Sequence, residues 1–208
     1  KTNKEVELYV DPSLKASSGQ PLGLNPFHEH DGVLDIVANR ADPSLQPAIG
    51  GYRFTSGLIT SQPSFSQLYG YFEARVKLVS GKGLWPAIWL LPADGSWPPE
   101  IDVMESIGDP MTAFMTVHSA TDKTPGVEVH PSSDGYHSYA VSWDSQHVVF
   151  YLDGVETQRW PTPADMHKPM YVLANLAMGG DWAGVPDAST RFPAHFSIDH
   201  IRVYRFSP

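Results

Sequence analysis

A chain of 208 residues with 41% hydrophobic content is long enough to bury one hydrophobic core and short for two domains. Its formal net charge of −9 argues against a nucleic acid as partner, because neutralising phosphates requires clustered Lys and Arg. The sequence has no apolar run of about eighteen residues that could span a membrane, and no cysteine for disulfide or thiolate chemistry. Neutral polymers remain open as ligands, and the six tryptophans can either fill a core or stack on sugar rings.

The chain consists of short segments with strand character. Helix signals are nearly absent, since 19 prolines and 17 glycines are spread along the sequence. β-branched and aromatic runs between these breaks predict strands, which in chain order are Val33–Ala38, Tyr52–Thr60, Tyr69–Val79, Leu84–Leu91, Glu100–Ile107, Ala113–Ser119, Tyr136–Trp143, Val148–Leu152, Met170–Met178 and Phe196–Phe206. Asp153-Gly154 predicts a tight hairpin turn that leads into a further strand, Val155–Trp160.

Ten or more short strands separated by turns predict an all-β sandwich. Neither an internal repeat nor a linker divides the sequence, so we expect residues 1–208 to form a single domain. Two segments without strand character, ASSGQPLGLN near the N-terminus and WAGVPDASTRFP near the C-terminus, are expected to be loops.

The segment YGYFEARVKL shows the alternation of a half-buried strand most clearly. Phe72 and Ala74 lie on its apolar face, while Glu73 and Arg75 lie on its polar face. Partial burial explains this pattern without any function. If the polar face is concave, however, Glu73 and Arg75 line a cleft.

The segment EIDVMES places three carboxylates within six residues of a predicted strand. Side chains alternate along a regular strand, so Glu100 and Asp102 share one face while Glu105 points to the other. One extra residue in a β-bulge at Val103-Met104 returns Glu105 to the first face. The α-carbons of the two glutamates are then roughly 13 Å apart at about 3.3 Å per residue, and their long side chains can close much of that gap.

Three acids on one face suit several kinds of site. Two carboxylates that flank a glycosidic bond are the usual minimum for hydrolysing it. A third between them keeps a neighbour protonated near neutral pH by like-charge repulsion or by sharing a proton. Three carboxylates also suit Ca²⁺ or Mg²⁺, and acid clusters on solvated strands are common. The flanking residues are unusual for solvated charge, because Ile101, Val103 and Met104 are apolar.

The segment GLWPAIWLLPADGSWPPEIDVMES resembles the active-site strand region of glycoside hydrolase family 16, the laminarinase and lichenase group. The spacing with an extra Met matches the bulged form of that family's acid motif. The resemblance continues in the expected order through YRFTSGLITSQPSFSQLYGYFEARVKL, YHSYAVSWDSQHVVFYLDGVETQRW, MYVLANLAMGGDWAG and FSIDHIRVYRF. The segment PTPADMHKPMYVLANLAMGG is most similar to bacterial endoglycanases that trim exopolysaccharides of the succinoglycan type.

The resemblance implies a concanavalin A-like β-jelly-roll sandwich of two antiparallel sheets, with a sugar-binding cleft on the concave sheet. By position in the motif, Glu100 is the expected nucleophile and Glu105 the expected acid/base, and Asp102 assists them. The remaining expected substrate-binding residues are Glu73, Arg75, Trp85, Trp89, Trp97, His118, Asn175 and Trp182. Several have a structural alternative: surface charge for the first two, core packing for some tryptophans, and a structural histidine for His118.

The resemblance also implies a structural Ca²⁺ on the convex side. Asp199 in IDHIRVY and Gly32 in DGVLDI match a carboxylate and a backbone carbonyl that bind the ion in many family members. The sequence departs from the family pattern at its N-terminus. Members usually have a strand before the segment that corresponds to NKEVELYV, and this chain begins at Lys1 without it. Catalysis itself is expected to need no cofactor.

These observations lead us to expect a retaining endo-β-glucanase that cleaves internal β-1,3 or β-1,4 bonds of a glucan or bacterial exopolysaccharide. A non-hydrolytic glycan-binding module and a transglycosylase on the same fold remain alternatives. Because a polymeric substrate lies outside the cell, we expect a secreted protein. We also expect a monomer without nucleic-acid or membrane partners.

Overall fold

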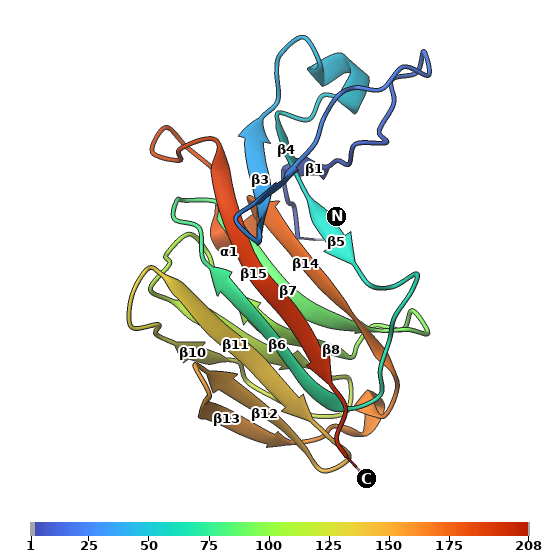
Figure 1. Ribbon diagram of the computed structural model, residues 1–208, viewed down its shortest axis with the longest axis vertical. Coiled ribbons are helices and arrows are strands. Elements are labelled where there is room, and N and C mark those ends of the chain that lie inside the picture. The colour runs from blue at the N-terminus through green and yellow to red at the C-terminus, as the bar shows by residue number, and fades with distance from the viewer. Residues whose placement is uncertain (1–2, 208) are drawn as a thin grey trace.

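The computed structural model describes residues 3–207, which fold as two β-sheets packed face to face (Figure 1). Over these residues one sheet has nine strands, in the order β1 (Glu7–Tyr9), β4 (Phe54–Ser56), β3 (Val33–Arg40), β15 (Ala194–Tyr204), β6 (Gly70–Lys77), β11 (Tyr136–Trp143), β12 (His147–Leu152) and β13 (Val155–Pro161), with β2 (Phe27–His30) paired to β3. The other has six, in the order β10 (Val127–Val129), β9 (Ala113–His118), β8 (Glu100–Glu105), β7 (Leu84–Pro92), β14 (Met170–Met178) and β5 (Leu58–Thr60).

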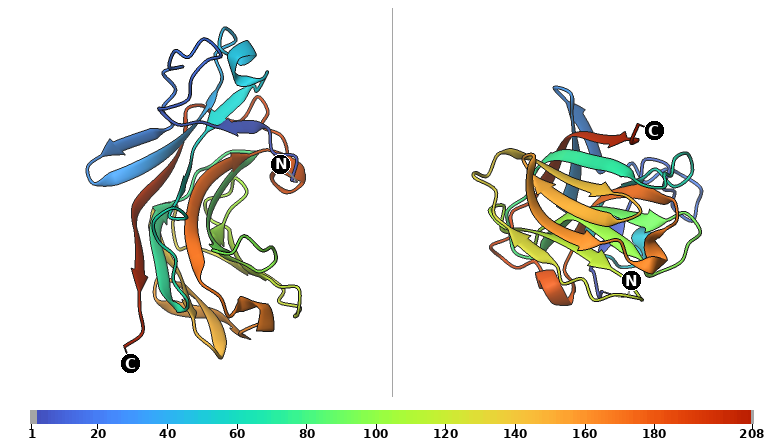
Figure 2. Two further views of the ribbon diagram at one scale, coloured as in Figure 1. Left: turned by 90° about the vertical axis from the view of Figure 1, so that its right-hand side faces the viewer. Right: turned by 90° about the horizontal axis from the view of Figure 1, so that it is seen from below.

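The prediction of an all-β jelly-roll sandwich is confirmed. Helical structure in residues 3–207 is limited to the short helix α1 (Gly180–Ala183) and two 3₁₀ turns, Gln46–Ile49 and Ala164–Met166. None of these helices is long enough to cross a membrane. Strand pairing is antiparallel except between β1 and β4, which run parallel at the edge of the nine-stranded sheet. The six-stranded sheet is curved, and its outer face is the concave one (Figure 2).

The hydrophobic core lies between the inner faces of the two sheets. Strand alternation supplies it, because every second residue of each long strand points inward. Phe72 on β6 is 2% exposed and Leu90 on β7 is fully buried. The largest fully buried side chains include Trp143, Tyr139, Phe54, Phe150, Phe196, Ile88, Ile101 and Met104. The β8 strand thus contributes apolar residues to the core while its acids face outward.

The predicted strand Tyr52–Thr60 is wrong as a single element. The chain pairs in the nine-stranded sheet as β4 and then crosses to the six-stranded sheet as β5, with Gly57 between them. A Cβ atom on Gly57 would lie 2.8 Å from the ring of Phe27 and 3.1 Å from Cγ2 of Ile36, so the crossing needs glycine. The short strands β1, β2 and β10 were not predicted, because three or four residues are too few to show alternation.

The predicted hairpin at Asp153-Gly154 is confirmed. Strands β12 and β13 are antiparallel neighbours, and the two turn residues have φ angles of 49° and 77°. Positive φ at both central residues is the signature of a type I′ turn, which favours Gly and tolerates Asp.

Candidate active site

The three acids of β8 share the outer face of the six-stranded sheet because the strand contains a bulge. Asp102 pairs with Thr116 on β9, and the next paired residue is Glu105 with Phe114, so two residues of β8 oppose one of β9. The register with β7 shifts at the same place. Val103 and Met104 are the two bulge residues of β8, and both are buried in the core, at 1% and 0% exposure. The predicted bulge at Val103-Met104 is therefore confirmed.

Asp102 lies at the centre of this row of acids and is almost completely buried. It is 2% exposed, and His118 Nε2 lies 3.0 Å from its Oδ2 atom without the alignment of a hydrogen bond. His118 Nε2 also lies 3.8 Å from Glu100 Oε1. Burial raises the pKa of Asp102 well above its usual range, and the charge of Glu100 and a hydrogen bond with it act in the same direction. Asp102 therefore holds a proton that it can share with Glu100.

Glu105 is set up to carry a proton near neutral pH. Burial raises its pKa to about 8, with a further contribution from the negative charge that Asp102 and Glu100 carry together. The indole of Trp85 donates a hydrogen bond from Nε1 to Glu105 Oε1 at 2.9 Å and partly opposes this rise. A protonated glutamic acid in this position can act as a general acid.

Two exposed tryptophans flank the acids. Trp97 is 66% exposed, and its Nε1 donates a hydrogen bond to Glu100 Oε2 at 2.9 Å. Trp182 on α1 is 42% exposed and packs edge-on against Trp85, with ring centroids 5.2 Å apart. Flat indoles at both ends of the acid row are suitable surfaces for sugar rings.

Asn175 and Trp89 hold one another in place beside the acids. Trp89 Nε1 donates to Asn175 Oδ1 at 2.7 Å, and Asn175 Nδ2 donates to the hydroxyl of Tyr9 at 3.0 Å. Asn175 is 5% exposed, and both ends of its amide have partners. In this arrangement Asn175 positions Trp89, and its contact with a sugar hydroxyl stays a prediction. No sequence signal pointed to Tyr9, because it comes from a distant edge strand.

The prediction that Glu73 and Arg75 line the cleft is wrong. They lie on β6, which belongs to the nine-stranded sheet, and the core side of that strand is taken by Phe72, Ala74 and Val76. The polar pair therefore faces outward on the opposite side of the sandwich from the acids. There Glu73 Oε1 lies 3.1 Å from His200 Nε2. Alternation predicted the polar face correctly but could not say to which sheet the strand belongs.

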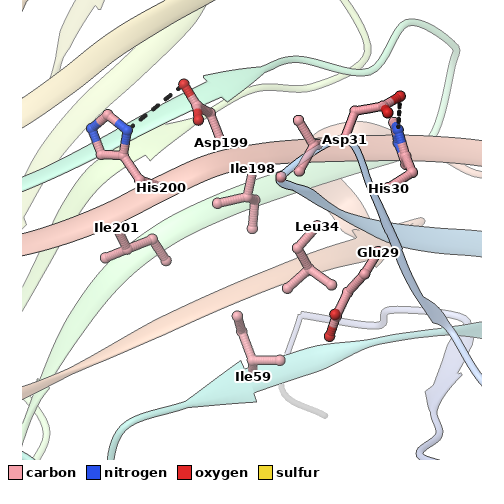
Figure 3. Close-up of a pocket in the computed structure, with 11 residues that line it drawn as sticks. Glu29, His30, Asp31, Leu34, Ile59, Ile198, Asp199, His200 and Ile201 are labelled. Atoms are coloured by element: carbon pink, nitrogen blue, oxygen red, sulfur yellow. Dashed lines mark ion pairs between the residues drawn. The ribbon is translucent and has the colours of Figure 1, made fainter.

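Gly32 and Asp199, the expected calcium ligands, both line a cavity of about 620 Å³ next to the β2–β3 hairpin (Figure 3). The carboxylate of Asp199 is already paired, since its Oδ2 atom accepts a 2.6 Å hydrogen bond from Arg75 Nη1, which lowers its pKa. Among the described residues, no three acidic or histidine side chains that line this cavity have ligand atoms converging within 4.8 Å. Calcium prefers about six to eight oxygen ligands, so binding here would require Asp199 to leave Arg75 and most ligands to be backbone carbonyls such as that of Gly32.

Calcium should consequently have little effect on stability. Adding Ca²⁺ to chelator-treated protein is expected to change Tm by less than about 1 °C, because a ligand stabilises the fold only as far as it binds the native state. Thermal unfolding with and without Ca²⁺ measures this, and Mg²⁺ serves as the control for ionic strength. A Ca²⁺-specific rise of several degrees that is lost in Asp199→Asn would contradict it.

Phe114 is a site residue that the sequence reasoning missed. It packs against Trp182 with ring centroids 5.0 Å apart and pairs directly with Glu105 across the sheet. A signal was present, because Phe114 and His118 are four residues apart on one strand and therefore share a face.

The model of the glycosyl hydrolases family 16 matches residues 26–199. The chain belongs to this family. The endo-1,3-1,4-beta-glycanases ExsH and EglC of Rhizobium meliloti (strain 1021) are 44% and 42% identical to it, over 98% and 97% of this chain and 44% and 43% of their own lengths. The chain thus spans less than half of each of these relatives. The laminarinase of Rhodothermus marinus superposes with a TM-score of 0.84 at 27% identity, over 100% of this chain and 87% of that one.

Proposed function

We propose that the protein is a retaining endo-β-glucanase that hydrolyses internal β-1,3 or mixed β-1,3 and β-1,4 bonds of a glucan or exopolysaccharide. The observation that carries the proposal is the bulge in β8, which brings Glu100, Asp102 and Glu105 to one face of a curved sheet. The similarity to endo-1,3-1,4-beta-glycanases and to a laminarinase supports the substrate class. A polymeric substrate of this kind places the enzyme outside the cell.

In the proposed first step, Glu105 donates its proton to the glycosidic oxygen as the bond from that oxygen to the anomeric carbon breaks. The Glu100 carboxylate attacks the anomeric carbon from the opposite face and forms a glycosyl ester. Before the attack, protonated Asp102 donates a hydrogen bond to the Glu100 carboxylate. This hydrogen bond weakens as Glu100 loses its negative charge on forming the ester. His118 Nε2, 3.0 Å from Asp102 Oδ2 and 3.8 Å from Glu100 Oε1, positions these two side chains.

In the second step, the ionised Glu105 takes a proton from a water molecule that attacks the anomeric carbon. The ester bond to Glu100 breaks, Glu105 is protonated again, and the product keeps the β configuration after two inversions. The raised pKa of Glu105 suits both roles, because an acid/base works best when its pKa lies near the operating pH. A sugar hydroxyl in place of water at this step would give transglycosylation.

A panel of glucans with product sizing tests the proposal. Incubation with β-1,3, mixed-linkage and β-1,4 glucans should give oligosaccharides of many lengths before small sugars accumulate, and only on polymers that fit the cleft. Nuclear magnetic resonance of the first products should show the β anomer before mutarotation. Binding without new reducing ends on any β-glucan or exopolysaccharide would identify a binding module instead, and an initial α anomer would exclude retention.

We propose Trp97 and Trp182 as stacking platforms on opposite sides of the cleavage point, and Trp85 and Trp89 as half-buried walls between them. Trp182→Ala and Trp97→Ala should each raise KM about 10-fold or more on polymers, since stacking contacts are worth roughly 1–3 kcal/mol, with smaller effects on short oligosaccharides that do not reach the ring. Steady-state kinetics against chain length measures this. Phe206→Ala, an exposed aromatic beyond the end of β15, is the matched control and should leave KM unchanged.

A further inference from the structure

A second cluster of potential ligand side chains lies on the nine-stranded sheet, on the opposite side of the sandwich from the acids. His28 and His30 are two residues apart on β2 and therefore share a face. His28 pairs directly with Asp35 on β3, and His195 reaches the same carboxylate from β15 on the other side of β3. Three adjacent strands thus bring three imidazoles around one carboxylate.

Ligand atoms of three of these residues converge closely, and His195 lies against the shared carboxylate. One atom each from His28, His30 and Asp35 all lie within 4.8 Å of one another. Asp35 Oδ2 lies 3.2 Å from His30 Nε2 and 2.8 Å from His195 Nδ1. Zinc bonds of about 2.0–2.1 Å at tetrahedral angles separate ligand atoms by roughly 3.3 Å, so small side-chain movements would admit an ion.

The burial of Asp35 is the second observation that points to a ligand. The residue is 5% exposed, and its Oδ1 atom is buried without an aligned hydrogen bond. A buried carboxylate oxygen without an aligned hydrogen bond is unusual, and a bound cation would satisfy it.

A second carboxylate, that of Asp31, contacts the other ring nitrogen of His30. This Nδ1 atom lies 3.6 Å from Asp31 Oδ2 at the tip of the hairpin (Figure 3). The Nε2 atom faces Asp35. Carboxylates commonly lie on the far ring nitrogen of metal-binding histidines. The rings of His28 and His30 stack with centroids 5.2 Å apart, so the two imidazoles lie side by side.

We propose that His28, His30, Asp35 and His195 form a site for a divalent transition-metal ion of the zinc type. Three imidazoles and one carboxylate match the ligand preference and coordination number of Zn²⁺, whereas Ca²⁺ and Mg²⁺ prefer oxygen ligands. The ion would join β2, β3 and β15, and so fasten the β2–β3 hairpin to the nine-stranded sheet. Its role is structural, because these side chains lie on the other sheet from Glu100 and Glu105.

Zinc titration of the chelator-treated protein tests this site. In competition with a chromophoric chelator, the wild type should bind Zn²⁺ at this cluster and its Tm should rise by about 5 °C at a roughly 100-fold excess of free zinc over Kd. The double variant His28→Ala/His30→Ala should bind at least about 100-fold more weakly, and His195→Gln about 10-fold more weakly. Glucanase activity without metal should stay unchanged in all three proteins.

Two controls make the result specific. His130→Ala removes an exposed histidine that contacts a carboxylate, Glu128, outside the cluster, and should bind zinc like the wild type. His118→Ala disables the other group of convergent ligands, Glu100, Asp102 and His118, and should leave the tight site intact. The proposal is overturned if the wild type shows no zinc-dependent rise in Tm, if the double variant binds like the wild type, or if His118→Ala alone abolishes binding. Circular dichroism and unchanged activity establish that the double variant is folded.

Discussion

Glu100→Gln should lower kcat on β-glucan by about 10⁴-fold or more while leaving Tm and glycan binding close to those of the wild type. The amide has the shape of the carboxylate and can still accept the hydrogen bond from Trp97 Nε1, but it is a very weak nucleophile. Initial rates on a mixed-linkage glucan, together with thermal unfolding and affinity electrophoresis, measure the three quantities. Substantial turnover in this variant would remove the role assigned to Glu100.

The alanine variant distinguishes a nucleophile from other essential acids. In Glu100→Ala a small anion such as azide can occupy the space of the lost carboxylate and attack the anomeric carbon once. The product should be an α-glycosyl azide, because a single displacement inverts the configuration. The same treatment of Glu105→Ala should instead give a β-glycosyl azide, because there the intact Glu100 still forms the ester and azide replaces water. Swapped outcomes would mean that the two roles are exchanged.

Glu105→Gln should lower kcat on polymers by about 10²–10⁴-fold, the usual contribution of a general acid. With an aryl glycoside whose leaving group needs no proton, formation of the ester should be much less affected, and its slow hydrolysis should appear as a burst of released phenol. Wild-type activity should fall as the pH rises through about 8, where Glu105 loses its proton. The pH profile of kcat/KM measures this, and an alkaline limb unchanged in Glu105→Gln would assign it to another group.

The same substitution should stabilise the fold at neutral and alkaline pH. The pKa of Glu105 is raised from 4.5 to about 8 in the folded state, so the need to ionise this group destabilises the fold. The loss of stability grows as the pH rises above 4.5 and becomes constant above 8. Removing the ionisable group should therefore raise the free energy of unfolding by about 4 kcal/mol near pH 8 and by almost nothing at pH 4. Urea unfolding at both pH values measures the difference, and an equal gain at both would indicate a cause other than ionisation.

Alternation of apolar residues was enough to predict most of the strands, because each half of the sandwich buries one face of every long strand. It also located the bulge in β8, since only an extra residue could place Glu105 with Asp102 while Ile101 and Met104 stay in the core. The same reasoning failed for Tyr52–Thr60. A strand that changes sheets at Gly57 looks continuous in sequence, because both halves are apolar.

Within the site, the acids and their tryptophans could be predicted because their motif is local and specific. Asn175 was placed in the right neighbourhood, but its protein partners were not predicted. Its two hydrogen bonds run to Trp89 and to Tyr9, which is separated from it by 166 residues. Whether a polar side chain is free to bind a ligand depends on such distant partners, and no local pattern records them.

By itself, then, the sequence determined the all-β class, the bulged acid strand and the family. Only the tertiary structure decided which sheet each strand joins. The alternation of apolar and polar residues shows that a strand has two different faces, but it does not show which sheet the strand belongs to. For this reason Glu73 and Arg75, predicted to line the cleft, lie on the opposite side of the sandwich. For the same reason the meeting of His28, His30 and Asp35 with His195 became visible only in three dimensions, where β3 lies between β2 and a strand some 160 residues later.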